Sequence, residues 1–261
     1  MQSAWNGFLR ASGPPGHGAQ VYDDVGELAD SVARYLAVGF DLREPALVVA
    51  TPEHWTECAT RLAELGWDGP RIAQHELLVL VDAEETLAAI MEGPAPSERK
   101  FGEVVGALMD ALAERFPERQ LRVFGEMVDL LCARGEADAA IALEALWNRL
   151  ARRRPFSLLC GYCLDVFDRE LQASLLPQIC RAHSHVLPAE DSARLDRAVG
   201  AALAETVGAE AGNVYALAGQ QLRRKEVPSA QLVLMWVSSQ MPRSADRILE
   251  SARTHYLAES A

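Results

Sequence analysis

The sequence predicts an α/β fold, in which a three-layer domain with a mostly parallel sheet is followed by an all-helical C-terminal region. Two observations lead to this prediction. Short apolar runs alternate with helical patterns between residues 17 and 187, and a helix is the compact way to connect two parallel strands. After Pro188 only helical patterns follow. We therefore divide the chain into a flexible N-terminal arm (1–16), an α/β domain (17–187) and a helical region (188–261).

Four apolar runs are predicted to be strands that are covered on both faces. They are 46–50, 77–81, 121–124 and 156–160. Apolar residues with helical spacing predict helices in the segments 25–36, 55–63, 101–112, 143–150 and 166–176. Thr51 before Pro52 is a typical helix start, and Asp82 with Glu85 forms a capping box.

The composition excludes several classes of protein. A formal net charge of −12 argues against a broad nucleic-acid or anionic-membrane surface. No segment approaches the ~20 apolar residues of a membrane span, and the N-terminus lacks the features of a signal peptide. Five cysteines without a disulfide-scaffold pattern indicate a reducing compartment. We therefore expect a cytoplasmic protein.

A ligand site is predicted at the carboxyl ends of the strands, where open parallel sheets bind ligands. The residues at these four ends offer a carboxylate, an imidazole, a thiol and a phenol: Thr51, His54, Asp82, Glu126, Cys160 and Tyr162. The chain lacks GxxxxGK[ST], GxGxxG and GxSxG motifs, so we expect neither ATP hydrolysis nor serine-hydrolase chemistry. For Glu126 two interpretations stay open: a charge that favours a helix start, or a pocket residue.

The pair Cys160 and Cys163 has three interpretations: buried strand-end thiols, a redox couple or half of a metal site. We favour the first, with Cys160 buried and Cys163 in the following loop, and expect neither a disulfide nor a catalytic couple. His17, His54 and Glu126 could complete a metal site, but no spacing fixes them. The cluster in residues 180–185 is predicted to be a solvated linker. We therefore predict no metal and no cofactor.

Six segments together resemble the MEDS (methanogen/methylotroph sensory) domain of dichloromethane-responsive repressor-type proteins. They are HGAQVY (17–22), REPALVVATPEHW (43–55), LVDAEETLAAIM (80–91), VFGEMVDLL (123–131), ALEALWNRL (142–150) and FSLLCGYC (156–163). The resemblance implies a RecA/KaiC-related fold without a functional Walker A motif, and small-molecule sensing in bacterial signal transduction and transcription regulation. It also implies functional roles for His17, Tyr22, Glu126 and Tyr162. The family commonly has proline where this chain has Cys163, which makes a family-wide redox role for the pair unexpected.

We therefore interpret the chain as a bacterial sensor or regulator whose ligand binds at the strand-end rim. The predicted ligand-binding residues are His17, Tyr22, Thr51, His54, Asp82, Glu126, Cys160 and Tyr162. Residues 190–261 would pass the signal to a regulatory partner or a second copy, and the apolar run 232–237 should be buried on more than one side. Direct nucleic-acid binding is not expected. Two alternatives remain: an enzyme with Glu126 and Tyr162 (or His17) as base and acid, and a ligand-free docking scaffold.

Overall fold

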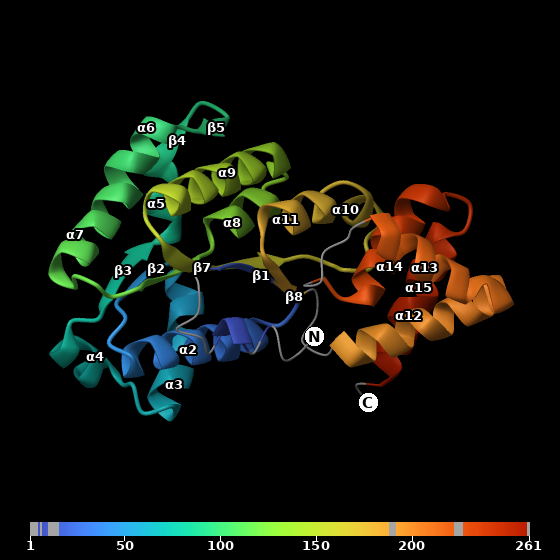
Figure 1. Cartoon of the computed structure of the whole chain (residues 1–261), viewed down its shortest axis with the longest axis horizontal. Coiled ribbons are helices and arrows are strands. Elements are labelled where there is room, and N and C mark those ends of the chain that lie inside the picture. Colours follow the sequence, from blue (N-terminus) through green and yellow to red (C-terminus); the bar gives the residue numbers. More distant parts are fainter. Residues whose placement is uncertain (1–4, 6, 10–15, 188–191, 222–226, 260–261) are drawn as a thin grey trace.

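The computed structural model of the chain describes residues 5, 7–9, 16–187, 192–221 and 227–259. Its centre is a six-stranded sheet with the order β3-β2-β6-β7-β1-β8, in which every neighbouring pair is parallel (Figure 1). The strands are β1 (His17–Tyr22), β2 (Ala46–Ala50), β3 (Leu78–Asp82), β6 (Leu121–Gly125), β7 (Phe156–Cys163) and β8 (His185–Leu187). A short antiparallel hairpin joins β4 (Met91–Glu92) to β5 (Ala95–Pro96).

Helices cover both faces of the sheet and form the outer layers (Figure 1). One face carries α2 (Val25–Asp41), α3 (Pro52–Glu64) and α4 (Gly69–His75). The other carries α5 (Ala83–Ile90), α6 (Glu98–Phe101), the π-helical η1 (Gly102–Gly106), α7 (Ala107–Arg115), α8 (Met127–Ala133), α9 (Ala137–Arg153) and α11 (Leu176–Ala182). Neighbouring residues of the central strands point to opposite layers, so Leu158 and Leu159 of β7 belong to different hydrophobic cores. The three-layer α/β prediction is confirmed.

The four predicted strands are all present, whereas β1 and β8 were not predicted. Strand β1 lies inside the sheet between β7 and β8, with His17 opposite Leu158 and Gly18 opposite His185. Gly18 lets the ring of Phe8 pack directly on this strand, because a Cβ at position 18 would lie 2.5 Å from that ring.

Three apolar residues of the predicted N-terminal arm pack on the α/β domain. Trp5, Phe8 and Leu9 are buried. The ring of Phe8 stacks on Tyr35 of α2 and on His185 of β8, with centroid distances of 5.7 and 5.1 Å. These three apolar side chains cover a part of the sheet and α2 that would otherwise face water. Residues 1–4, 6 and 10–15 of the predicted arm lie outside the described part.

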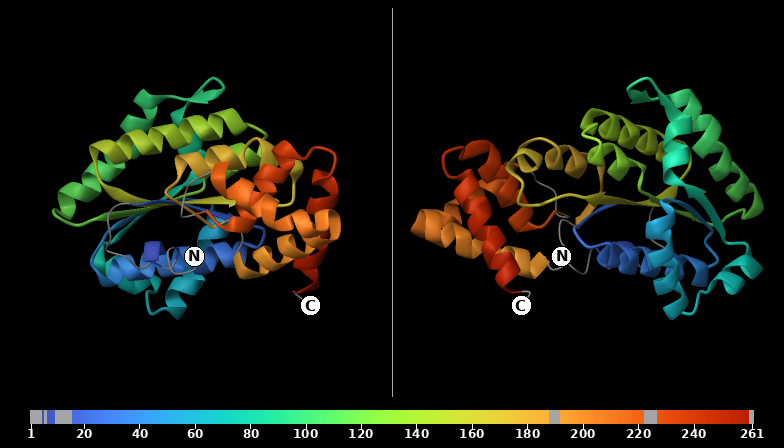
Figure 2. Two further views of the ribbon diagram at one scale, coloured as in Figure 1. Left: turned by 45° about the vertical axis from the view of Figure 1, so that its right-hand side comes forward. Right: turned by 180° about the vertical axis from the view of Figure 1, so that it is seen from behind.

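The C-terminal helices form a compact group on the β8 side of the sheet, far from β3 (Figures 1 and 2). They are α12 (Ser192–Val207), the 3-10 helix η2 (Gly208–Glu210), α13 (Ala211–Gln221), α14 (Ser229–Gln240) and α15 (Ala245–Ala258). Helix α14 packs on α10 (Arg169–Ala173) of the α/β domain as well as on α12, α13 and α15. Leu232–Met235 and Val237 are buried there, as the apolar run predicted. This burial occurs within the chain, so the run does not by itself require a partner.

No described helix combines the length and the apolar character that crossing a bilayer would take.

Candidate functional site

Glu126 follows β6 directly, and its side chain is 1% exposed, so the carboxylate needs partners inside the protein. Its Oε2 accepts hydrogen bonds from the backbone N–H of Thr51 at 2.9 Å and from the Thr51 hydroxyl at 3.3 Å. Its Oε1 lies 3.0 Å from Nδ1 of His54. The side chain makes no cap hydrogen bond to α8. The Glu126 side chain therefore connects the ends of β2 and β6 and does not cap helix α8, which it precedes.

Asp129, in the first turn of α8, connects two more strand ends. Its Oδ2 accepts a hydrogen bond from the hydroxyl of Tyr22 at 2.7 Å, and its Oδ1 accepts one from the backbone N–H of Cys163 at 2.7 Å. The ring of Tyr22 meets that of His54 edge-on, with 6.2 Å between centroids. We call Tyr22, Thr51, His54, Glu126 and Asp129 the rim cluster, because it connects the ends of β1, β2, β6 and β7.

The rim cluster shifts the protonation of its members. The hydrogen bond that His54 makes to the Glu126 carboxylate raises the pKa of His54 above its usual 6.5, against the effect of burial. Burial raises the pKa of Asp129, although the hydrogen bonds from Tyr22 and from the Cys163 backbone oppose the shift. Burial, with the charge of Asp129, also raises the pKa of Tyr22. His54 therefore favours its protonated, positively charged form, and the buried carboxyl groups of Glu126 and Asp129 lie in the same cluster.

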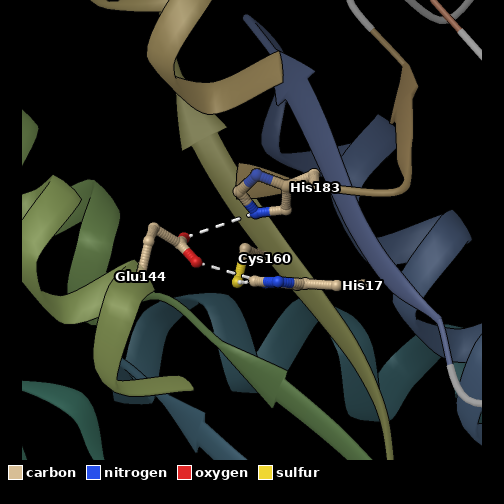
Figure 3. A group of neighbouring side chains, drawn as sticks. All are labelled: His17, Glu144, Cys160 and His183. Carbon is tan, nitrogen blue, oxygen red and sulfur yellow. Dashed lines mark hydrogen bonds and ion pairs between the residues drawn. The ribbon is translucent and has the colours of Figure 1, made fainter. Parts of the chain in front are cut away.

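A second group of polar side chains lies on the α9 side of the sheet (Figure 3). His17 begins β1, Glu144 lies on α9, Cys160 lies in β7, and His183 follows α11. The Nε2 atom of His17 is 3.2 Å from Oε2 of Glu144 and 3.4 Å from Sγ of Cys160. The Nε2 atom of His183 is 3.4 Å from Oε1 of Glu144. We call these four residues the His–Glu–Cys cluster.

Further contacts fix the orientation of these side chains. Nδ1 of His17 is 3.2 Å from Oδ1 of Asn148, whose own Nδ2 donates to the carbonyl oxygen of Ala182 at 3.0 Å. Nδ1 of His183 donates to the carbonyl oxygen of Ile179 at 2.8 Å. The hydroxyl of Tyr162 donates to Oε1 of Glu144. Both imidazoles therefore turn Nε2 toward Glu144.

Burial and charge act together on the His–Glu–Cys cluster. Burial opposes the negative charge of Glu144, but His183 and His17 outweigh it and hold the pKa of Glu144 well below its usual 4.5. Burial lowers the pKa of His17, and the neighbouring His183 lowers it further against the attraction of Glu144. Burial and the charge of Glu144 raise the pKa of Cys160 well above 9.0. Glu144 is thus the anionic member, and Cys160 is a thiol.

A pocket of about 350 Å³ opens beside the rim cluster. Tyr22 and Asp23 at the end of β1 line it together with Cys163, the last residue of β7, and the loop 164–167 that follows. Helix α15 closes it with Arg253, Tyr256 and Leu257. The lining is largely apolar, with Arg253 paired to Asp165 by a 2.6 Å contact.

The structure divides the predicted ligand residues into two groups. Tyr22, Thr51, His54 and Glu126 come together in the rim cluster, and Tyr22 also lines the pocket. His17, Cys160 and Tyr162 instead gather around Glu144. Asp82 is the N-cap of α5 and accepts a hydrogen bond from the backbone N–H of Glu85 at 2.9 Å, as the capping pattern predicted. Glu126 contacts Thr51 and His54, whereas Tyr162 contacts Glu144.

Two further predictions concern the cysteines and the segment 180–185. Cys160 is buried as predicted, but Cys163 is the exposed last residue of β7 and lines the pocket. Their side chains leave the strand on opposite faces because they are three residues apart. The prediction of a solvated linker over 180–185 is wrong: Cys180 and His183 are buried, and His185 begins β8.

Sequence reasoning missed the two carboxylates Asp129 and Glu144. Both carry the same signal, which is a charged residue among apolar neighbours on the buried face of a helix. Glu144 shares helical spacing with Ala140, Leu143 and Trp147, all of which are buried. A buried carboxylate at such a position needs a partner, and here the partners come from distant strands.

Comparison with curated proteins finds no match to this chain. The model of a protein family, described as "MEthanogen/methylotroph, DcmR Sensory domain" and abbreviated MEDS, matches residues 16–183. The matched segment contains five of the six strands of the sheet, all but β8, and it also contains the rim cluster and the His–Glu–Cys cluster. By this match, the chain belongs to the MEDS family of sensory domains.

Proposed function

We propose that this protein is a small-molecule sensor whose ligand binds in the pocket between the strand ends and helix α15. The observation that carries the proposal is the composition of the pocket wall. Tyr22, Cys163 and Phe167 come from the family-matched domain, whereas Tyr256 and Leu257 come from the C-terminal helices. A molecule bound there would touch both parts of the chain.

The contacts around the pocket give the ligand a means to act on α15. The ring of Tyr256 packs on Phe167 with 5.6 Å between centroids, and Arg253 pairs with Asp165. These contacts hold α15 against the loop after β7. A ligand that binds better when they are formed shifts the chain toward the docked arrangement, because binding favours the state with the higher affinity. A regulatory partner or a second copy of the chain would then bind the C-terminal helices in this docked arrangement.

The pocket suits a small organic compound with an apolar body. Its volume lies near the lower end of the usual range for ligand sites, about 300–1,000 Å³. Val21, Val166 and Leu257 supply apolar surface, while Arg253 and Tyr256 supply polar groups at one side. An anionic or hydrogen-bonding head group beside Arg253 would fit this distribution.

The test uses 8-anilinonaphthalene-1-sulfonate as a probe, since it combines an aromatic body with an anionic group. Leu257 is 57% exposed and lines the pocket, so Leu257→Trp should obstruct it without disturbing the core. Leu217→Trp on α13 is the matched control, because Leu217 is 46% exposed and is not among the lining residues. We expect Leu257→Trp to weaken binding by about tenfold, or ~1.4 kcal/mol, in a calorimetric titration. Equal affinities for both variants and the wild type would refute the pocket as the ligand site.

Coupling to the C-terminal helices is tested separately by hydrogen exchange. Binding of the probe should slow amide exchange in α15 and leave α4, on the opposite side of the sheet, unchanged. Protection confined to the strand-end loop would mean that ligand binding is not transmitted to α15.

A further inference from the structure

We propose that the His–Glu–Cys cluster is a binding site for one zinc ion, held by His17, Glu144, Cys160 and His183 (Figure 3). The donor atoms are Nε2 of both histidines, Sγ of Cys160 and a carboxylate oxygen of Glu144. The site is separate from the pocket proposed for the sensed molecule, and none of its four residues lines that pocket.

The spacing of the donor atoms matches tetrahedral coordination. All four lie within 4.8 Å of one another. The separations from Nε2 of His17 are 3.2 Å to Glu144 and 3.4 Å to Cys160, and His183 lies 3.4 Å from Glu144. Zinc bonds of about 2.0–2.3 Å imply separations of about 3.3–3.8 Å between the ligands of a tetrahedral ion. An ion would thus need only small movements of these side chains.

The hydrogen bonds of the two histidines place the ring proton on Nδ1, so that Nε2 can bind a metal. A carbonyl oxygen can only accept, so Nδ1 of His183 carries the proton in its bond to Ile179. Asn148 donates through Nδ2 to Ala182, which turns its Oδ1 toward Nδ1 of His17 and requires a proton there as well. In the neutral rings both Nε2 atoms therefore present lone pairs. Metal-bound histidines are usually oriented in this way by a second partner.

One oxygen of the buried Glu144 carboxylate lacks a hydrogen-bond donor among the residues that the structure describes. Tyr162 donates to Oε1, but Oε2 accepts no hydrogen bond from any residue in the described part of the chain. The Nε2 atom of His17 lies 3.2 Å from this oxygen. One proton could bridge two of the four donor atoms, whereas a metal ion satisfies all four at once.

The charges balance when a divalent ion is bound. Two neutral imidazoles, one carboxylate and one thiolate bring a total charge of −2, which Zn²⁺ cancels. Cys160 must lose its proton to bind, so each ion taken up releases one proton from the thiol to solvent. A neutral site suits the surroundings, because Glu144, Cys160 and His183 are 2% exposed or less.

The donor set selects the class of metal. Ca²⁺ and Mg²⁺ prefer oxygen ligands, whereas two imidazoles and a thiolate suit zinc and its transition-metal neighbours. Four protein ligands leave no open position, which is typical of structural zinc. The ion would tie β1, β7 and α9 to the segment between α11 and β8, from which the chain continues toward the C-terminal helices.

The test begins with the full chain, purified without a histidine tag and reconstituted with zinc under reducing conditions. We expect one zinc per chain by mass spectrometry of the metal. Replacing zinc with Co²⁺ should give the intense visible bands of tetrahedral cobalt and a thiolate-to-cobalt charge-transfer band. Cys160→Ala should abolish the charge-transfer band. Cys58→Ala is the matched control, because Cys58 is equally buried but belongs to the core on the other face of the sheet.

A second variant keeps the proposal testable if Cys160→Ala does not fold. Asn148→Ala removes the partner of His17 but no ligand, and it should lower zinc affinity about 10–100-fold in competition with a chelating dye. A folded wild-type chain that binds no zinc after reconstitution would overturn the proposal. An unchanged cobalt spectrum in folded Cys160→Ala, or unchanged affinity in Asn148→Ala, would overturn the assigned ligand set.

Discussion

At the scale of single residues, Arg122 shows how this fold holds a charge inside its core. It lies in strand β6 and is 1% exposed. Its Nε donates to Oε2 of Glu44 at 2.6 Å, and its Nη1 donates to the carbonyl oxygens of Tyr35 and Leu9 at 2.8 and 3.1 Å. Gly39 makes room for it, because a Cβ there would lie 2.4 Å from Cδ of Arg122. A helix, a loop and the N-terminal segment are thus fixed to one central side chain.

Removing Glu44, the anionic partner of Arg122, should lower the stability of the fold strongly. Glu44→Ala leaves a buried guanidinium without its counter-charge, and we expect the free energy of unfolding to fall by about 3–5 kcal/mol. Urea denaturation followed by circular dichroism measures the change. The control is Glu103→Ala, which removes the exposed partner of Arg99 and should cost less than ~1 kcal/mol. Similar losses in both variants would mean that burial does not strengthen the Arg122–Glu44 pair.

His54 should titrate above its usual range. Its hydrogen bond with Glu126 favours the imidazolium, the charges of Asp129 and Glu53 add to this effect, and burial opposes it. Because the folded-state pKa is raised, protonated His54 stabilises the fold. This contribution is fully present below pH 6.5 and is lost as the pH rises through the higher folded-state pKa. Nuclear magnetic resonance titration of the ring should give a midpoint above 6.5.

The matched variant for this titration is Glu126→Gln, which keeps the shape of the side chain and removes its charge. The midpoint of His54 should then fall toward its ordinary value. A midpoint that does not move would show that Glu126 is not the cause of the shift.

The candidate site could be predicted only where residues follow a strand. Thr51, His54 and Glu126 come together because parallel strands end at one edge of a sheet, and that rule needs only the sequence pattern. Glu144 and His183 follow no such rule. They meet His17 because β1 inserts beside β7, and this pairing brings together residues more than a hundred positions apart.

At the scale of elements, helix α14 is joined to the α/β domain by a buried pair of amides. Nε2 of Gln231 donates to Oε1 of Gln172 on α10 at 2.6 Å, and both side chains are 0% exposed. Gln172 in turn donates to the carbonyl oxygen of Val166, in the loop that lines the pocket. This chain of hydrogen bonds connects α14 to the strand-end loop.

Breaking the pair should loosen α14 and lower stability. Gln231→Ala leaves Oε1 of Gln172 without its donor, at a cost of about 1–3 kcal/mol. Amide exchange in α14 and in the loop at 164–167 should accelerate. Gln240→Ala, at the exposed end of the same helix, is the control and should change neither the stability nor the exchange. Unchanged exchange in both variants would mean that the pair does not hold α14 in place.

Strands with mostly apolar sequences could be predicted, whereas a strand whose apolar pattern is interrupted could not. Strand β2 is a continuous apolar run, and β6 is apolar except for Arg122; both were predicted within a residue of their bounds. Strand β1 reads His-Gly-Ala-Gln-Val-Tyr, in which Gly18 and Gln20 interrupt the apolar pattern. Its place in the sheet comes from pairing with β7 and β8, which no local pattern encodes.

At the scale of the whole molecule, the C-terminal helices share one hydrophobic core with the α/β domain. Leu158 of β7, Ile179 of α11, Leu203 of α12 and Leu234 of α14 belong to the same continuous cluster. The family match ends at residue 183, yet the core does not end there. The C-terminal region therefore behaves as part of the body of the protein in its packing.

A chain that ends at residue 187 should consequently be damaged. Removing α12–α15 uncovers the surface of α10 on which α14 and α15 pack. We expect a lower urea midpoint and a less cooperative transition than in the full chain, measured by circular dichroism and tryptophan fluorescence. A truncated chain with the full-length midpoint and cooperativity would contradict this expectation and favour two independently folding parts.

The position of β1 also has a consequence for how the protein is made. Its backbone bonds reach across most of the chain: the N–H of His17 donates to the hydroxyl of Ser184, 167 residues later. A ribosome delivers residues 17–22 first, but their neighbours in β7 and β8 are among the last parts of the domain to emerge. The earliest strand must therefore wait as an unpaired segment of the nascent chain, and the sheet closes around it only after most of the domain has been synthesised.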